Sequence, residues 1–369
     1  PELKTTTVVN RLAISVQQLV EIARAIALGC RVLILDEPTS SLTGEDVEHL
    51  FQVIKELKER DYAIIYISHF IEEIQRIADR FTVLRDGKTV GGGEMAQTAP
   101  EEIVALMVGR DVKEIYPRSP RPTGEVALSI NNLSADNRLE EATLSLRRGE
   151  VVGVAGLMGS GRTELLRAIF GLDQVLSGEI RVFQYEGPAT PAQRWKQGVG
   201  MVSENRKEEG LALNMSIAEN LILPMPARIE SHGMISPGRM KEAARQWIDT
   251  LSVRCHEPMQ PVGSLSGGNQ QKVAIARLLY RDADVYLLDE PTRGIDVGSK
   301  VQIYGLIDRL ACDNKAVVIV SSYLPELLGI CDRIAVMCKG RLGPARPVAE
   351  VDEHSLMVEA TALEVAGAP

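Results

Sequence analysis

The stretch GLMGSGRT, from Gly156 to Thr163, decides the fold. It follows the apolar run VVGVA and precedes the helix-like run ELLRAIF, so it is expected to join a buried strand to a helix. Its spacing matches G-x-x-x-x-G-K-[ST], in which backbone N–H groups approach phosphate oxygens, except that Arg162 stands at the lysine position. The stretch therefore predicts a phosphate-binding loop in an α/β domain.

The following helix points its positive dipole end toward the loop, which favours an anion there, and the Thr163 hydroxyl can bind Mg²⁺. A glycine-rich turn can also be only a tight connection between a strand and a helix. If the loop binds phosphate, the nucleotide-binding residues are Gly156, Gly159, Ser160, Gly161, Arg162 and Thr163.

A carboxylate pair ends a second apolar run, VYLLDEPT. Asp289 closes the expected strand and can hold Mg²⁺ through water. Glu290 follows it and is positioned to orient or activate an attacking water. Such a pair could also be a solvated helix cap, but the repeat described next favours a catalytic pair.

The same pattern occurs 253 residues earlier, in VLILDEPTSSLT, where Asp36 and Glu37 form the pair. This offset also aligns QQ, DR and glycine landmarks over roughly eighty residues, which predicts two copies of one domain. An equivalent of GLMGSGRT would fall ahead of residue 1, so we expect the sequence to lack the front of its first domain. The predicted parts are 1–116 (first domain, C-terminal part), 117–124 (linker), 125–356 (second domain) and 357–369 (disordered tail).

The stretch LSGGNQQ, Leu265 to Gln271, precedes another helical pattern and offers a second helix N-terminus to an anion. Here the sequence resembles the ATP-binding-cassette ATPases, whose signature is L-S-G-G-Q, and Asn269 is the departure from it. Without that resemblance the stretch could be a plain glycine loop. With it, the expected ligands of a facing nucleotide are Ser266, Gly267, Gly268, Asn269 and Gln270.

The resemblance covers essentially the whole chain except MVEATALEVAGAP at its end. It implies an α/β P-loop NTPase fold with two ABC-type ATPase domains, the first partial. Each would have a mostly parallel core sheet, a small antiparallel β subdomain and a helical subdomain. It also implies ATP and Mg²⁺ as cofactors.

More narrowly, GSGRTELLRAIFG, VSENRKEEGLALNMSIAENL, LSGGNQQK and DEPTRGIDVGSK look like the second cassette of the double-cassette ATPases of bacterial monosaccharide importers. Arg162, and Glu204 where most cassettes carry a glutamine, are features of that family. The resemblance implies ATP hydrolysis that drives import of a ribose-, galactose- or xylose-like sugar. Its partners would be membrane permease subunits and, indirectly, an extracytoplasmic sugar-binding protein, with this subunit at the cytoplasmic face of the membrane.

Two alternatives stay open at this point. Importers of nucleosides or signalling sugars share the same architecture. The ribosome-associated double-cassette translation factors belong to another class, and a long charged helical linker is expected of them, whereas the linker here is short and rich in proline.

In the head-to-tail arrangement that the family implies, the first site uses Asp36 for Mg²⁺, Glu37 as catalytic carboxylate and His69 as the γ-phosphate contact, with the second signature facing them. The second site faces the degraded first signature LAISVQQ, in which the serine position is Ala13. Its histidine position holds Ser322. We therefore expect hydrolysis at the first site and slow or no hydrolysis at the second.

The composition argues against a nucleic-acid-binding protein, a membrane-spanning protein and a disulfide-stabilised protein. The net charge of −9 and the pI near 5.3 disfavour nucleic acid as a partner. No apolar run approaches the ~18 residues that a membrane span needs. The cysteines are odd in number, scattered and without C-x-x-C spacing, which suits a reducing cytosol: Cys30, Cys255, Cys312, Cys331 and Cys338.

Overall fold

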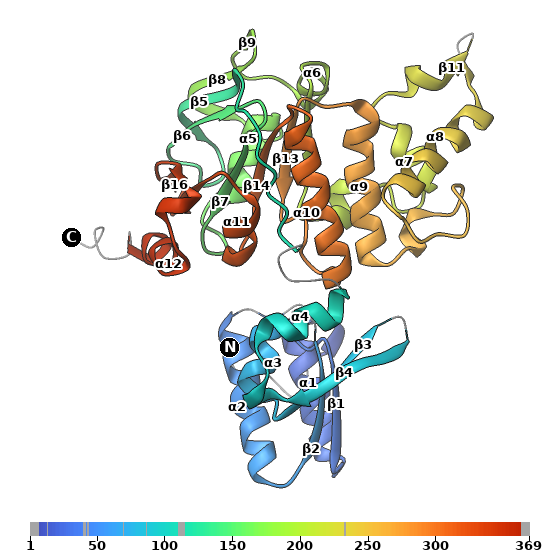
Figure 1. Cartoon of the computed structure of the whole chain (residues 1–369), viewed down its shortest axis with the longest axis vertical. Helices are drawn as coiled ribbons and strands as arrows, with labels where there is room; N and C mark the ends of the chain where they lie inside the picture. The colour runs from blue at the N-terminus through green and yellow to red at the C-terminus, as the bar shows by residue number, and fades with distance from the viewer. Residues whose placement is uncertain are drawn as a thin grey trace. The chain divides into compact units, whose positions relative to one another are not determined.

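A computed structural model describes residues 7–12, 14–39, 42, 44–68, 70–85, 87–109, 115–231 and 234–362 (Figure 1). The chain divides into two compact units. The first comprises residues 1–112 with 296–298, and the second comprises 113–295 with 299–369.

The second unit is built on a mainly parallel sheet. Its parallel strands run in the order β10, β13, β14, β7, β15, and two short strands extend it antiparallel to β15. Every residue of the central strands β7, β13 and β14 is buried, as expected of a parallel sheet covered on both faces. The strands are β7 (Val151–Ala155), β10 (Val199–Val202), β13 (Val285–Asp289), β14 (Ala316–Val320), β15 (Arg333–Cys338), β16 (Arg341–Leu342) and β17 (Arg346–Pro347).

A smaller antiparallel sheet lies beside it in the same unit. Its order is β6 (Ala142–Arg147), β5 (Val126–Ala135), β8 (Val175–Val182) and β9 (Tyr185–Glu186). Side chains of both sheets and of α5 (Arg162–Phe170) belong to one hydrophobic core. The helix after the phosphate loop is thus fixed by burial from two sides.

Helices and short elements make up the rest of the second unit. α7 packs against α8 and α9 and forms the helical part seen to one side of the sheet in Figure 1. Ser216 closes a reciprocal capping box with Glu219 at the start of α7. The elements are α6 (Pro191–Lys196), a π-helical turn (Arg206–Gly210), α7 (Ile217–Ile222), β11 (Glu230–Ser231), β12 (Met234–Ile235), α8 (Pro237–Thr250), α9 (Gly267–Arg281), α10 (Val297–Cys312), α11 (Leu324–Ile330) and α12 (Glu353–Ala362).

Residues 117–124 pack onto the second unit. The Arg121 side chain is 5% exposed and bonds to Asp308 at 2.9 Å and Asp332 at 2.8 Å. The Ser119 hydroxyl donates to Asp308 at 2.7 Å. The boundary between the units lies at residues 112 and 113, a few residues before the predicted linker, because these polar contacts anchor the proline-rich segment.

The prediction of a disordered tail from residue 357 is wrong for residues 357–362. These residues continue α12, in which Leu356 is fully buried and Ala360 is 6% exposed. The Cys338 thiol of β15 also donates to the Ala360 carbonyl. An i, i+4 apolar pair packs this alanine-rich helix against the sheet edge, and residues 363–369 lie outside the described residues.

The first unit contains two pairs of strands and four α-helices among its described residues. β1 and β2 are parallel, and β3 and β4 form an antiparallel hairpin. The elements are α1 (Ile14–Ala27), β1 (Val32–Asp36), α2 (Gly44–Glu59), β2 (Ala63–Ile67), α3 (Ile71–Ile77), β3 (Arg80–Arg85), β4 (Lys88–Glu94) and α4 (Pro100–Val108).

The 253-residue offset of the sequence repeat recurs in the local structure. Both ends of β1, α2, β2, α3 and β3 match those of β13, α10, β14, α11 and β15 at this offset. Val32 pairs with Ala63 as Val285 pairs with Ala316, so the strand register is the same as well. The two segments therefore fold alike element by element.

Candidate functional site

The phosphate loop turns directly from β7 into α5. Gly156, Gly159 and Gly161 have φ of 151°, 78° and 111°, a region that favours glycine. A Cβ at Gly156 would collide with the Met337 carbonyl oxygen. Gly161 is the N-cap of α5 and no side chain caps this end, so the first N–H groups of the helix can receive an anion.

The carboxylate pair lies at the same edge of the sheet as this loop. β13, β14 and β7 are adjacent and parallel, so their carboxyl ends meet there. Asp289 is the last residue of β13, and Glu290 has φ 45° with its N–H donating to the Val320 carbonyl at 2.9 Å. The left-handed backbone at Glu290 turns the chain sharply, which places its carboxylate beside the phosphate loop.

Arg162 links the two motifs. Its side chain is 8% exposed, and its Nη2 lies 3.4 Å from Glu290 Oε1. Its other terminal nitrogen, Nη1, is buried without a hydrogen-bond partner, and so are the Ser160 hydroxyl and both Asp289 carboxylate oxygens. Buried polar atoms are nearly always bonded, so unpartnered donors and acceptors at one edge of the sheet fit a site for phosphate oxygens and a cation.

Burial makes both carboxylates hard to ionise. Burial, with a smaller contribution from the Glu290 charge, raises the pKa of Asp289 to about 7, against the opposing effects of the Thr163 hydroxyl and Arg162. Burial also raises the pKa of Glu290, which Arg162 and hydrogen bonds from Ser322 partly offset. A cation bound at this edge would favour the ionised form of both carboxylates and so lower their pKa.

Thr163 and Asp289 are therefore suited to Mg²⁺, which takes one or two protein oxygens together with phosphate oxygens and water. In the part of the chain that the structure describes, no group of three His, Cys, Asp or Glu side chains could hold a metal by itself. Most ligands of a cation here would have to come from the nucleotide and from water.

Glu204 follows β10 and faces the same loop. The Thr163 hydroxyl lies 3.5 Å from Glu204 Oε2, and Arg293 forms an ion pair with Glu204 Oε1. Sequence reasoning missed Arg293. The repeat does offer a signal, since the first copy has Ser40 at the matching position and the arginine is therefore specific to the second copy. Arg293 thereby holds Glu204 beside the Thr163 hydroxyl.

The signature residues form the start of α9. Ser266 is its N-cap, and the Asn269 amide donates to the Ser266 hydroxyl at 2.8 Å and accepts from the Arg254 N–H at 2.8 Å. Gln270 is buried and donates to the Leu265 carbonyl at 3.0 Å. Asn269, the departure from the family signature, thus braces the loop rather than pointing to solvent.

Gly267 and Gly268 begin the helix itself, and a Cβ at Gly267 would collide with the guanidinium of Arg206. Arg206 is another residue that sequence reasoning missed. Among the described residues, no hydrogen bond or ion pair joins the predicted signature ligands to the phosphate loop of the same unit.

In the first unit, Asp36 ends β1 and Glu37 repeats the geometry of Glu290. Its φ is 48° and its N–H donates to the Ile67 carbonyl at 2.9 Å. The predicted residues His69 and Ala13 lie outside the described residues. The carboxylate pair of the first copy is therefore built as in the second, and its histidine stays a prediction.

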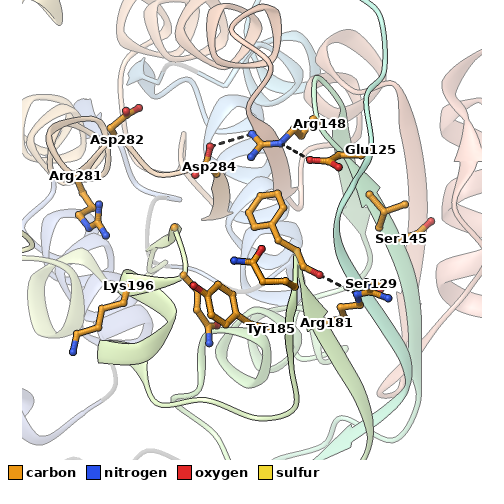
Figure 2. Close-up of a pocket in the computed structure, with 15 residues that line it drawn as sticks. Glu125, Ser129, Ser145, Arg148, Arg181, Tyr185, Lys196, Arg281, Asp282 and Asp284 are labelled. Carbon is orange, nitrogen blue, oxygen red and sulfur yellow. Dashed lines mark hydrogen bonds and ion pairs between the residues drawn. The ribbon is translucent and has the colours of Figure 1, made fainter.

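Two cavities among the described residues of the second unit bear on the search for a site. One of about 910 Å³ is lined by residues of β5, β6, β8, β9 and α6 and by the end of α9 with the turn before β13, and contains none of the predicted nucleotide residues (Figure 2). Arg148 bonds there to Asp284 at 3.0 Å and stacks on the Phe183 ring, so part of its charge is compensated internally. The other, of about 400 Å³, lies next to the phosphate loop at Arg138 and Glu164.

The fold is that of known ATP-binding cassettes. A crystal structure of a nucleotide-free ATP-binding cassette from an ABC transporter superposes with a TM-score of 0.55 at 20% identity, covering 66% of this chain and all of that one. A cassette dimer in a post-hydrolysis state with ADP and Pi gives a TM-score of 0.52 at 23% identity, covering 60% of this chain and 98% of that one.

Sequence relatives are closer. The ABC transporter family profile matches residues 139–293. A protein named as a ribose/galactose/methyl galactoside import ATP-binding protein, from Burkholderia cenocepacia (strain HI2424), is 45% identical over 98% of this chain and 72% of its own length. The chain belongs to the ABC transporter family, among its ATPase subunits.

A second relative of this ABC ATPase is named ribose import ATP-binding protein RbsA 2, from Rubrobacter xylanophilus (strain DSM 9941 / JCM 11954 / NBRC 16129 / PRD-1). It is 45% identical over 97% of this chain and 69% of its own length. Within the described residues of the ABC ATPase, no helix has the length and apolar character of a membrane span.

Proposed function

We propose that this protein binds and hydrolyses Mg²⁺-ATP to drive import of a simple sugar of the ribose or galactose type. The main support for an ATP site is the group of unpartnered buried atoms at Ser160, Arg162 and Asp289, which lie at the carboxyl edge of a parallel sheet. The names of relatives at 45% identity support sugar import. The sugar would cross the membrane through separate permeases, fed by an extracytoplasmic binding protein, with this subunit at the cytoplasmic face.

Different residues of the second unit bind phosphate, hold Mg²⁺ and orient water. Arg162 Nη1 and the first N–H groups of α5 bind phosphate oxygens, and Thr163 and Asp289 hold Mg²⁺, which neutralises charge on those oxygens. Glu290 orients the attacking water. Because Glu290 is paired with Arg162 at 3.4 Å in this structure, phosphate binding must compete with that pair.

We also propose that the first unit is a second cassette of the same kind. Its matching element bounds support this, and so does one exposed face of its sheet. Ile34 and Ile65 are 62% and 52% exposed, whereas their counterparts Leu287 and Val318 are fully buried in the core that they share with the strand and helix flanking the phosphate loop. Such a face is expected to be covered by a similar strand–loop–helix segment.

The two composite sites of the proposed cassette pair are unequal. The site with Asp36, Glu37 and His69 hydrolyses ATP. The site with Asp289 and Glu290 mainly holds it, because Ser322 is too short to replace a histidine at the γ-phosphate.

Uptake of labelled ribose, galactose and methyl galactoside by cells with and without this gene tests the function. We expect loss of uptake of at least one of these sugars on deletion, and restoration by the wild-type gene but not by a Glu37→Gln gene. Unchanged uptake of all three would contradict sugar import. Co-purification with ribosomes instead of membrane permeases would favour the translation-factor class.

A further inference from the structure

A fully buried carboxylate lies behind the candidate site and has no task in the mechanism above. Glu326 of α11 is 0% exposed. Its Oε2 accepts hydrogen bonds from the Thr292 hydroxyl at 2.7 Å and from the Ser321 hydroxyl at 3.2 Å. Both donors are themselves buried, at 3% and 1% exposure. One carboxylate oxygen therefore joins two loops inside the protein.

These two loops are the ones that carry the reacting groups. Thr292 comes two residues after Glu290, in the loop that leaves β13. Ser321 follows the end of β14 and adjoins Ser322, which lowers the pKa of Glu290 by hydrogen bonding. The shared acceptor thus sits where a movement of either loop would shift Glu290 relative to Ser322.

The same arrangement occurs in the first unit. Glu73 Oε2 accepts from the Thr39 hydroxyl at 2.9 Å and the Ser68 hydroxyl at 3.1 Å, the counterparts of Thr292 and Ser321 at the repeat offset. The surroundings differ, because the Tyr66 hydroxyl adds a third bond at 2.8 Å and the second unit has Ile319 there. Both units therefore have the hydrogen bonds from threonine and serine to the buried glutamate, although a neighbouring residue differs between them.

Packing alone does not account for a carboxylate here. Burying one costs desolvation energy that an apolar side chain of similar volume would not, and burial raises the pKa of Glu326 to about 7. Such a group is useful where two hydroxyls must be held in one geometry. A leucine would fill the space without joining the loops.

We propose that Glu326 in the second unit and Glu73 in the first are positioning residues, each fixing the loop behind the carboxylate pair to the loop that ends the neighbouring strand. Each thereby sets Glu290 or Glu37 in place. The consequence for hydrolysis rests on the proposed function, whereas the joining of the loops does not.

Hydrogen exchange on the nucleotide-free protein tests the joining directly. In Glu326→Leu and Thr292→Val, the amide exchange rate should rise at least about fivefold in both residues 290–294 and residues 321–323. Each variant removes a hydrogen bond that joins the two loops through Glu326. Glu326→Gln should keep most protection, because its amide oxygen can accept from the same hydroxyls. Thr361→Val, which removes a hydroxyl bonded only within α12, is the matched control.

A lower melting temperature in Glu326→Leu with unchanged exchange in both loops would mean space filling only and would overturn the proposal. Loosening of residues 290–294 alone would also contradict it, and so would a Glu326→Gln variant that exchanges as fast as Glu326→Leu.

Steady-state ATPase activity of the full-length protein, with the front of its first domain present, tests the catalytic consequence at the first unit. Glu73→Leu and Thr39→Val should lower kcat about tenfold or more with KM for ATP within about twofold, since a displaced water-orienting carboxylate affects turnover rather than binding. Glu73→Gln should restore most of kcat. Unchanged kcat in Glu73→Leu would overturn the positioning role. A wild-type protein without ATPase activity would instead refute the proposed function, while the exchange result would still decide whether the loops are joined.

Discussion

The guanidinium of Arg162 lies between the phosphate loop and the Glu290 carboxylate. A planar guanidinium replaces the usual lysine, and its fork reaches Glu290 with one nitrogen while the other stays unpartnered. A lysine has only one charged nitrogen to offer. Arg162 can therefore hold a carboxylate before ATP arrives and a phosphate afterwards.

Competition for Arg162 makes a prediction for Glu290→Gln. Removing the carboxylate charge should tighten ATP binding, because Arg162 loses its internal partner and the phosphates lose a repelling neighbour. We expect a gain of about threefold to tenfold, as for a partly desolvated charge pair. Titration with a fluorescent ATP analogue measures it, and weaker binding by Glu290→Gln would contradict the competition.

The buried carboxylate of Glu326 predicts a pH dependence of stability. Burial holds its folded-state pKa near 7, with the Thr292 hydroxyl, Lys300 and the Ser321 hydroxyl acting to lower it and Glu290 to raise it. The folded state therefore binds a proton more readily than the unfolded one, so stability is highest below the unfolded pKa and falls as pH rises through about 7.

Urea unfolding of the wild type and of Glu326→Gln at about pH 5.5 and about pH 8 measures this dependence. The variant should lose less stability between the two pH values than the wild type does, by an amount on the order of 2 kcal/mol at most. Equal losses in the two proteins would mean that Glu326 titrates normally.

At the scale of elements, the predicted strands and helices reflect apolar patterns that the sequence shows openly. The run VVGVA forms β7, and ELLRAIF lies in α5 with Leu165, Leu166 and Ile169 buried. The phosphate loop and both carboxylate pairs were predictable because their chemistry depends on residues close in sequence.

Other features could not be predicted, because they depend on contacts between distant segments. The ion pair of Arg293 with Glu204 joins residues 89 positions apart, and the Glu326 side chain reaches Thr292 over 34. The packing of residues 117–124 depends on Asp308 and Asp332, which lie far along the chain. The composition of these segments gave no sign of such partners.

α12 carries the clearest element-scale prediction. Leu356→Ala should destabilise the protein by about 2–5 kcal/mol, the range for emptying a fully buried leucine site. Met357→Ala, at a neighbouring position that is 44% exposed, should have little effect. Thermal or urea unfolding distinguishes them, and equal stability of the two variants would show that α12 does not dock on β15.

At the scale of the whole molecule, the account predicts unequal roles for the two carboxylate pairs. Glu37→Gln should abolish most ATPase activity, whereas Glu290→Gln should leave more than about half of it, because Glu37 is the proposed hydrolytic carboxylate. Phosphate release assays on the purified full-length protein, with the front of its first domain present, measure both. Equal losses would mean that the two sites hydrolyse ATP equally.

We expect the second unit to bind Mg²⁺-ATP through the loop from Gly156 to Thr163, and calorimetric titration with Mg²⁺-ATP measures this binding. Wild-type protein should bind, Arg162→Ala should bind at least about tenfold more weakly through loss of a charge-assisted contact, and Lys196→Ala, in the separate cavity of Figure 2, should bind like the wild type. Equal affinity of wild type and Arg162→Ala, or loss of binding in Lys196→Ala, would contradict the account.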